Sequence, residues 1–209
     1  MPSHVASDPR QFTADAVLLL AGRHQLALNE TLSDCLDNPP AWTRDVTLGD
    51  LTRRTSGITD GEGFSCSKAV DVPGKAKSYD EKDGSFTPHS SPWKQYGDGS
   101  VQTTPGELVR WAADNHRTGR MGGTELLAGV TDDAVSVGDV LRPRDIEEGR
   151  YGAGILLPDK SLVHGGDREG VHSTLKVSPD HNAAVTVGCN AEPPDNFRAA
   201  NQLPDIWTK

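Results

Sequence analysis

The sequence has few cysteines and no long apolar run, and these two absences exclude several classes of protein. Its three cysteines, Cys35, Cys66 and Cys189, are scattered and form no C-x-x-C pair, which excludes a disulfide framework and a zinc ribbon. We expect them to be small buried residues. The longest apolar run, residues 16–21, is far too short to span a bilayer, and no signal-peptide pattern precedes it. The sequence therefore predicts a cytoplasmic protein without a membrane partner.

Positive charge and ligand-binding motifs are also scarce. Lys and Arg number 21 against 30 Asp and Glu, a formal net charge of −9, so a nucleic-acid backbone would be repelled. The motifs H-E-x-x-H and G-x-x-x-x-G-K-[ST] and the EF-hand loop are absent. His164, His172 and His181 are spaced as strand and turn residues rather than as metal ligands. We expect neither a nucleic-acid partner nor a metal or cofactor.

The composition that remains is typical of one globular domain over residues 1–209. Charged residues make up 24% and hydrophobic residues 34%, while 22 Gly and 14 Pro indicate many turns. A helical first part precedes a stranded last part, which predicts an α+β fold with helices packed on a reduced antiparallel sheet.

Three helices are predicted in the first part. Residues 11–22 are apolar with almost no charge, as in a helix that is buried nearly all round. Residues 47–50 resemble a capping box, which predicts a short helix that ends at residues 56–57. Residues 104–107 form a better capping box with Pro105 at the first helical position, and Gly119 closes the helix that follows.

Loops and strands account for most of the rest. Residues 59–99 are rich in Gly, Ser, Asp and Lys, which predicts a long loop. A three-stranded antiparallel meander is predicted over residues 151–157, 162–164 continuing through 171–177, and 183–189, followed by a helix near residues 195–207. Gly165, Gly166 and Gly170 interrupt the second strand, either as a simple bulge or to let a ligand or another backbone approach closely.

Several segments in order resemble one family. Residues 7–14, Ser-Asp-Pro-Arg-Gln-Phe-Thr-Ala, resemble the S-x-x-K-Q-F-T-A segment of serine β-lactamase-like hydrolases. These include class C-type β-lactamases, D-alanyl-D-alanine carboxypeptidases and related esterases. Residues 46–58 and 97–108 are similar to the family's H-T-S-G-I and G-D-G-G-L segments, and residues 151–154, 164–170 and 185–190 to its Y-G-x-G, H-G-G and terminal strand. The matches are specific as an ordered set.

The resemblance implies a β-lactamase/transpeptidase-like fold and a serine hydrolase site. Ser7 would attack a small ester, amide or β-lactam substrate. The segment His164-Gly165-Gly166 would line the sheet side of the cleft, and the backbone N–H groups of Ser7 and Asp167 would form the oxyanion hole.

The sequence departs from the family in three places. Arg10 stands where the family has the lysine that takes the serine proton, and a guanidinium does not lose its proton in a protein. Residues 64–68 are the nearest match to F-S-Y-S-N and place Cys66 at the tyrosine and Lys68 at the asparagine. The chain also begins at the serine motif, so we expect it to lack the family's first two strands, part of its helical region and the export signal that members often carry.

Two functions of different classes follow. The first is an acyl-transfer hydrolase with impaired catalysis, in which Arg10 gives electrostatic support, Lys68 is a substitute base and His164 faces the substrate. The second is a non-catalytic binding or interaction module that retains the fold. In the plainest interpretation, Ser7 is a helix N-cap, Arg10 and Lys68 are solvated cations and His164 is a polar strand residue.

The last predicted strand suggests self-association. Residues 183–189, Ala-Ala-Val-Thr-Val-Gly-Cys, carry no charge and no proline. With the family's first strand missing, their outer edge would be unpaired, and an unprotected edge pairs readily with another chain. We therefore expect a homodimer or aggregation through this strand.

Overall fold

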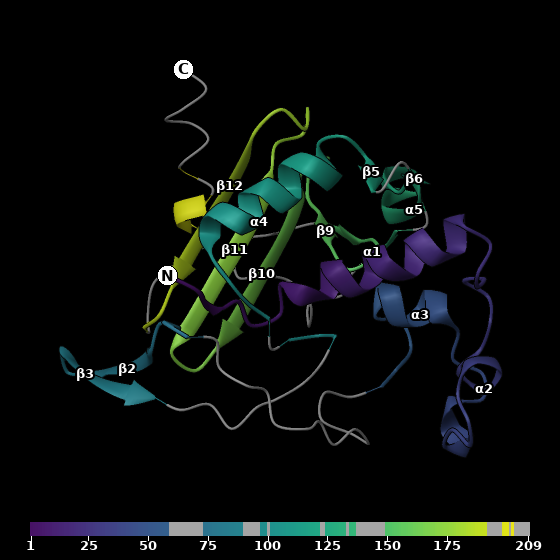
Figure 1. Ribbon diagram of the computed structural model, residues 1–209, viewed down its shortest axis with the longest axis horizontal. Coiled ribbons are helices and arrows are strands. Elements are labelled where there is room, and N and C mark those ends of the chain that lie inside the picture. Colours follow the sequence, from purple (N-terminus) through teal and green to yellow (C-terminus); the bar gives the residue numbers. More distant parts are fainter. Residues whose placement is uncertain are drawn as a thin grey trace.

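Six antiparallel strands form the central sheet of the computed structural model, in the order β12-β11-β10-β9-β8-β7. The structure describes residues 1–58, 73–89, 97–99, 101–121, 124–132, 134–136, 149–191, 198–200 and 202. The strands are β7 (Val135–Ser136), β8 (Arg150–Tyr151), β9 (Leu156–Leu157), β10 (Leu162–Arg168), β11 (Val171–Val177) and β12 (Ala184–Cys189). The last three are long and lie side by side (Figure 1).

The α+β class with an antiparallel sheet is confirmed, but the three-stranded meander is wrong. Gly170, at a φ of +66°, turns the chain after Arg168, so the predicted second strand is a hairpin of two full strands, β10 and β11. Gly154, at a φ of +69°, divides the predicted first strand into β8 and β9. In both places the prediction joined two short β-favouring runs into one strand and placed no turn between them.

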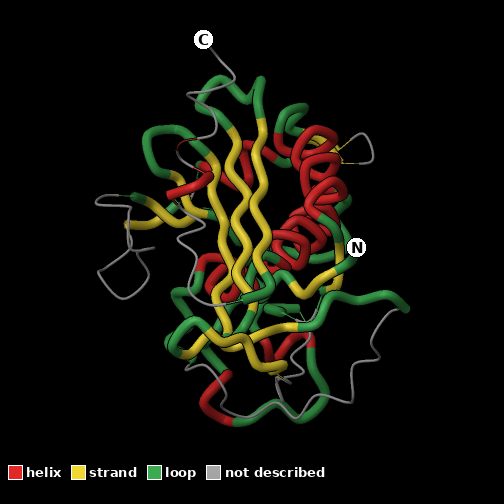
Figure 2. The backbone as a smooth tube through the Cα atoms, turned by 90° about the vertical axis from the view of Figure 1, so that its left-hand side faces the viewer, coloured by secondary structure: helices red, strands yellow, loops and turns green. Residues whose placement is uncertain are grey.

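Helices α1 (Pro9–Gly22) and α4 (Pro105–Trp111), with a π-helical turn over Ala112–His116, cover one face of the long strands (Figure 2). The capping box of α4 is confirmed: Thr104 Oγ1 accepts a hydrogen bond from Glu107 N at 3.2 Å, and Glu107 Oε2 accepts one from Thr104 N at 3.1 Å. This pair fixes where α4 begins.

The hydrophobic core lies between α1 and the covered face of the sheet. Ala14 and Leu18 of α1 pack in one cluster with Leu162, Leu175 and Val177. Burying each large side chain contributes about 1.5–3 kcal/mol. The prediction that this helix is buried nearly all round is wrong, because only one of its sides meets the sheet and Leu20 is 38% exposed.

Smaller elements surround this core. The helices are α2 (Leu32–Cys35), a 3-10 turn (Ala41–Thr43), α3 (Leu48–Arg53) and α5 (Leu127–Thr131). Three two-stranded sheets pair β1 (Ser3–His4) with β4 (Gln102–Thr103), β2 (Ser78–Lys82) with β3 (Ser85–His89), and β5 (Arg120–Met121) with β6 (Thr124–Glu125). The capping box of α3 is confirmed, but the helix ends at Arg53 because Arg54 adopts a left-handed φ of 60°.

The predicted loop over residues 59–99 contains the hairpin β2–β3, which projects from one end of the molecule (Figure 1). Its turn, Asp83-Gly84, has positive φ at both residues, the backbone that Asp-Gly favours between paired strands. Hardly any residue of the two strands is buried, so no alternation of apolar and polar residues indicated the hairpin in the sequence. Residues 59–72 and 90–96 lie outside the described part of the chain.

The cysteine prediction is also wrong where it can be checked. Cys35 is exposed because α2 is a short surface helix, and Cys189 is half-buried because β12 is the edge of the sheet. Among the described residues, β12 pairs with no strand except β11, which agrees with an open edge. Of the predicted last helix, residues 198–200 are helical and most others lie outside the description. No helix within the described ranges is long and apolar enough to cross a membrane.

Candidate active site

Ser7 lies in a strained turn that leads into α1. Its neighbour Ala6 has a φ of 42°, a left-handed backbone that residues other than glycine rarely adopt, and Asp8 N donates to Val5 O at 3.0 Å to close the turn. The interpretation of Ser7 as the N-cap is wrong, because Asp8 occupies that position. Strained backbone of this kind is common at functional sites.

The serine turn, which we define as residues 5–8, packs directly on β10 and β11. A Cβ on Gly166 would lie 2.6 Å from Ser7 N and 2.3 Å from Val5 O, so only glycine allows this approach. Ser173 of β11, the cross-strand partner of Gly166, donates through Oγ to Val5 O at 2.8 Å. The H-G-G segment and the serine turn, far apart in sequence, are therefore in contact.

Three buried polar side chains converge next to this turn. Asp8 is fully buried, and His164 and Tyr151 are each 4% exposed. His164 Nδ1 is 3.6 Å from Asp8 Oδ1, and His164 Nε2 is 3.3 Å from Tyr151 Oη. The histidine ring thus lies between a carboxyl group and a phenol.

Charges near Tyr151 act against the effect of its burial. Burial raises the pKa of Tyr151, whereas the positive charges of Arg10 and Arg54 lower it and so favour the phenolate. Arg10 is mostly buried and forms an ion pair with Asp98 at 3.8 Å. The G-D-G segment also contacts α1 through a hydrogen bond from Thr13 Oγ1 to the Gly97 carbonyl.

A separate network anchors α1 to α4. Gln11 Oε1 accepts hydrogen bonds from Trp111 Nε1 at 3.2 Å and from His116 Nε2 at 2.8 Å. Burial lowers the pKa of His116 to about 4, so this ring is neutral near pH 7. Phe12 packs edge-on against Trp111 with ring centroids 4.6 Å apart. These contacts hold the helix that directly follows the turn with the candidate nucleophile.

The structure brings most of the predicted site residues to one corner. Ser7 and Arg10 lie at the start of α1, and His164, Gly165, Gly166 and Asp167 follow one another in β10. The Asp167 side chain is 72% exposed and pairs with His172 Nδ1 at 3.1 Å. Cys66 and Lys68 lie outside the described residues.

Gly170 belongs to a different place. It occupies the β10–β11 turn, and a Cβ there would lie 2.9 Å from Tyr79 N of hairpin β2–β3. The glycine cluster therefore serves two contacts, Gly166 at the serine turn and Gly170 at the hairpin.

Sequence reasoning missed Asp8 and Tyr151. Both stand inside segments that carry the family resemblance, but each occupies a position that the family pattern leaves open or assigns no role. Their partnership with His164 depends on three distant segments meeting. Within the described part of the chain, no three His, Cys, Asp or Glu side chains come together as a metal site would require.

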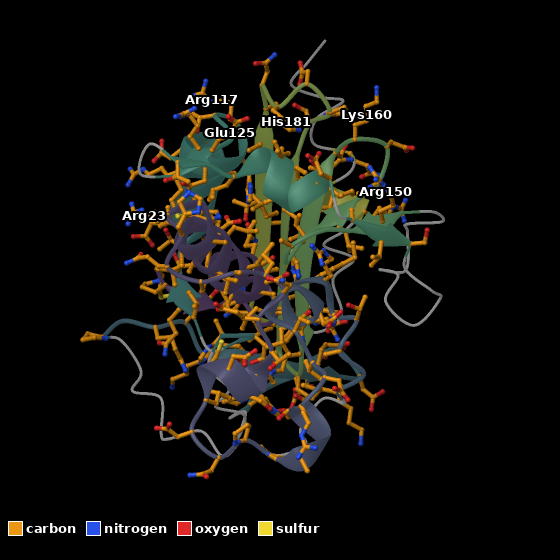
Figure 3. The ribbon with its side chains drawn as sticks, turned by 90° about the vertical axis from the view of Figure 1, so that its right-hand side faces the viewer. Arg23, Arg117, Glu125, Arg150, Lys160 and His181 are labelled. Atoms are coloured by element: carbon orange, nitrogen blue, oxygen red, sulfur yellow. The ribbon has the colours of Figure 1, made fainter. Side chains whose placement is uncertain are left out.

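Charged side chains in other parts of the molecule differ from Asp8 in their exposure to water. Arg117, Glu125 and His181 lie toward one end of the molecule and Arg150 toward its edge (Figure 3). The ion pair between Arg120 and Glu125 at that end spans 4.0 Å between two exposed side chains, so water screens it. Asp8, by contrast, is shielded from water.

Comparisons with known proteins identify the fold. No family model and no curated protein matches the sequence. A penicillin-binding protein from Bacillus halodurans matches the structure with a TM-score of 0.71 and 18% identity, over 99% of this chain and 87% of that one. A class C β-lactamase from Rhodobacter sphaeroides matches with a TM-score of 0.68 and 13% identity, over 99% and 85%.

A third match is an amidase. The D-amino acid amidase from Ochrobactrum anthropi SV3, solved with D-phenylalanine, matches with a TM-score of 0.66 and 16% identity, over 97% of this chain and 90% of that one. At these identities the likeness establishes a common fold along nearly the whole chain, and it confirms the fold that the sequence segments predicted.

Proposed function

We propose that this chain, which has the serine β-lactamase-like fold, is a slow acyl-transfer hydrolase of small esters, amides or β-lactams. Ser7 is the nucleophile and forms an acyl-enzyme that water then hydrolyses. The observation that carries the proposal is the contact between the serine turn and Gly166, which places Ser7 N beside β10.

The oxyanion hole of this proposal combines Ser7 N–H with Asp167 N–H. Gly166 allows the serine turn to approach the strand, and Asp167 is the next residue along β10. Two backbone donors aimed at the developing negative charge typically contribute about 10²–10³ in rate each. The exposed side chain of Asp167 has no part in this role.

Arg10 explains why the reaction should be slow. It stands one helical turn after Ser7, where a base would be useful, but it stays protonated and is paired with Asp98. It supplies a fixed positive charge instead. Losing a general base costs about 10²–10⁴ in rate. Lys68 remains a proposed substitute base.

The alternative is a binding module that retains the fold without catalysis. The Arg10–Asp98 ion pair favours it, since the residue at the base position is held in a structural contact. A small ester, amide or β-lactam would then bind without forming an acyl-enzyme.

Intact mass spectrometry after exposure to a fluorophosphonate or penicillin probe separates the two. The hydrolase predicts a single adduct on the wild type that Ser7→Ala abolishes, with Ser3→Ala, a neighbouring serine in β1, as the matched control that still reacts. An unmodified wild type after prolonged exposure, with ligand binding by calorimetry, would establish the module instead.

A further inference from the structure

We propose that Tyr151, His164 and Asp8 form a proton relay that serves as the base for Ser7 in place of the family's lysine. The inference rests on the proposed function, because it takes Ser7 as the nucleophile. It adds a base built from three residues in which His164 lies 3.6 Å from Asp8 and 3.3 Å from Tyr151.

The first step is the pairing of Asp8 with His164. Both oxygens of Asp8 and the Nδ1 of His164 are buried without a hydrogen-bond partner, and Nδ1 faces Oδ1 at 3.6 Å. A buried carboxylate without a partner is costly, and a proton on Nδ1 directed at Oδ1 offsets part of that cost by electrostatic attraction, although 3.6 Å is longer than a hydrogen bond. The surroundings therefore assign the proton to Nδ1.

The second step fixes the role of the other ring nitrogen. In a neutral imidazole with Nδ1 protonated, Nε2 has a lone pair and accepts a hydrogen bond. The Tyr151 hydroxyl, 3.3 Å away, is then the donor. The direction of the relay follows: a proton can pass from Tyr151 to His164, while Asp8 stabilises the resulting imidazolium as in a serine–histidine–aspartate triad.

The third step relates the relay to Ser7 through the backbone. His164 and Gly166 are two residues apart in β10 and so face the same side of the sheet. Gly166 contacts Ser7 N, and His164 faces Asp8, the residue after Ser7. The positive charge of Arg10, which favours the Tyr151 phenolate, also comes from the first turn of α1.

The proton movements balance. As Ser7 Oγ bonds to the acyl carbon, its proton passes to the Tyr151 oxygen, and the proton of Tyr151 passes to His164 Nε2. The carbonyl electrons move onto the oxygen in the oxyanion hole. When the bond to the leaving group breaks, the relay runs in reverse and the leaving group takes the proton. Tyr151 is then a catalytic residue, and Asp8 is a positioning residue for His164.

The test compares labelling rates of Asp8→Asn and Tyr151→Phe with the wild type, using a fluorophosphonate probe and intact mass. We expect each variant to label about 10²–10⁴-fold more slowly, the range for removing a general base. The matched controls are Asp80→Asn and His89→Gln, which break a similar pair, Nδ1 to Oδ2 at 2.8 Å, in hairpin β2–β3. Variants that label as fast as the controls would overturn the relay.

A second readout does not depend on catalysis. Nitrogen-15 NMR of the imidazole, assigned with His164→Gln, should show the Nδ1–H tautomer in the wild type and its loss or exchange broadening in Asp8→Asn. An Nε2–H tautomer in the wild type would refute the relay even where Ser7 is labelled. If Ser7 is never labelled but the Nδ1–H tautomer is present, the proposed function fails while the pairing of Asp8 with His164 stands.

Discussion

Replacing Gly166 with alanine should separate the serine turn from the sheet. The new Cβ would lie 2.3 Å from Val5 O and 2.6 Å from Ser7 N, whereas ordinary contact begins near 3.4 Å. Because the obstructing atoms are backbone, β10 and the serine turn must move apart by about 1 Å, and misplacement on that scale typically costs about 10²-fold in rate. Overpacking of this kind also costs about 1–3 kcal/mol of unfolding free energy.

Gly188→Ala is the matched control. Gly188 of β12 pairs with Ser173, which in turn pairs with Gly166, so the two glycines lie in one row on the same face of the sheet. A Cβ on Gly188 would meet Pro105 Cγ at 3.4 Å, an ordinary van der Waals contact. We expect this variant to keep the stability and the probe reactivity of the wild type.

The assay measures the rate of fluorophosphonate labelling at Ser7 together with the free energy of urea unfolding. Gly166→Ala should lose most of the labelling rate and part of the stability, and Gly188→Ala neither. If Gly166→Ala matched the wild type in both measurements, the serine turn would not pack against β10, and the geometry of the candidate site would be incorrect.

Three further predictions concern other parts of the chain. Arg10→Lys should raise the rate of ester or cephalosporin hydrolysis, since a lysine can act as a base beside Ser7; an unchanged rate would show that Arg10 is not the limiting residue. Burial raises the pKa of Asp15 from 3.8 to about 7, so the unfolding free energy should fall as the pH rises from about 4 to 7. Asp15→Asn should remove that pH dependence and raise the free energy of urea unfolding at pH 8 by up to about 4 kcal/mol. If the unfolding free energy of the variant fell with pH as steeply as that of the wild type, this prediction would be contradicted. Val187→Lys should shift a dimer formed through β12 toward monomer or unfolding in light scattering, and a wild type that stays monomeric at tens of micromolar would contradict edge pairing.

Local chemistry in the sequence was enough to predict several elements. The capping boxes that begin α3 and α4 depend on side chains three residues apart, so their geometry is contained in a few consecutive positions. The β-lactamase-like fold was predicted from short segments in a fixed order, and the structural matches confirm it. The order of these segments indicates the fold because each segment occupies a fixed place in the same architecture.

Turns were harder to predict because one residue decides them. Gly170 separates β10 from β11, and the residues before it in β10, Gly165-Gly166-Asp167-Arg168, have little intrinsic preference for strand, so period-two patterns do not reveal that β10 extends to this turn. The burial of α1 was overestimated for a similar reason: its apolar residues indicate a buried helix, but only the position of the sheet decides which side is covered.

The sequence by itself was enough to predict where α3 and α4 begin and the fold to which the ordered segments point. Only the tertiary structure decided that Asp8, His164 and Tyr151 meet, and that Gly166 lies against the serine turn. The reason is that the contacts of the serine turn with His164 and Gly166 join positions more than 150 residues apart, and their distances depend on how α1 and the sheet pack through the core. No local pattern around Asp8 indicates that its carboxylate will be buried, because its burial comes from the sheet that covers it.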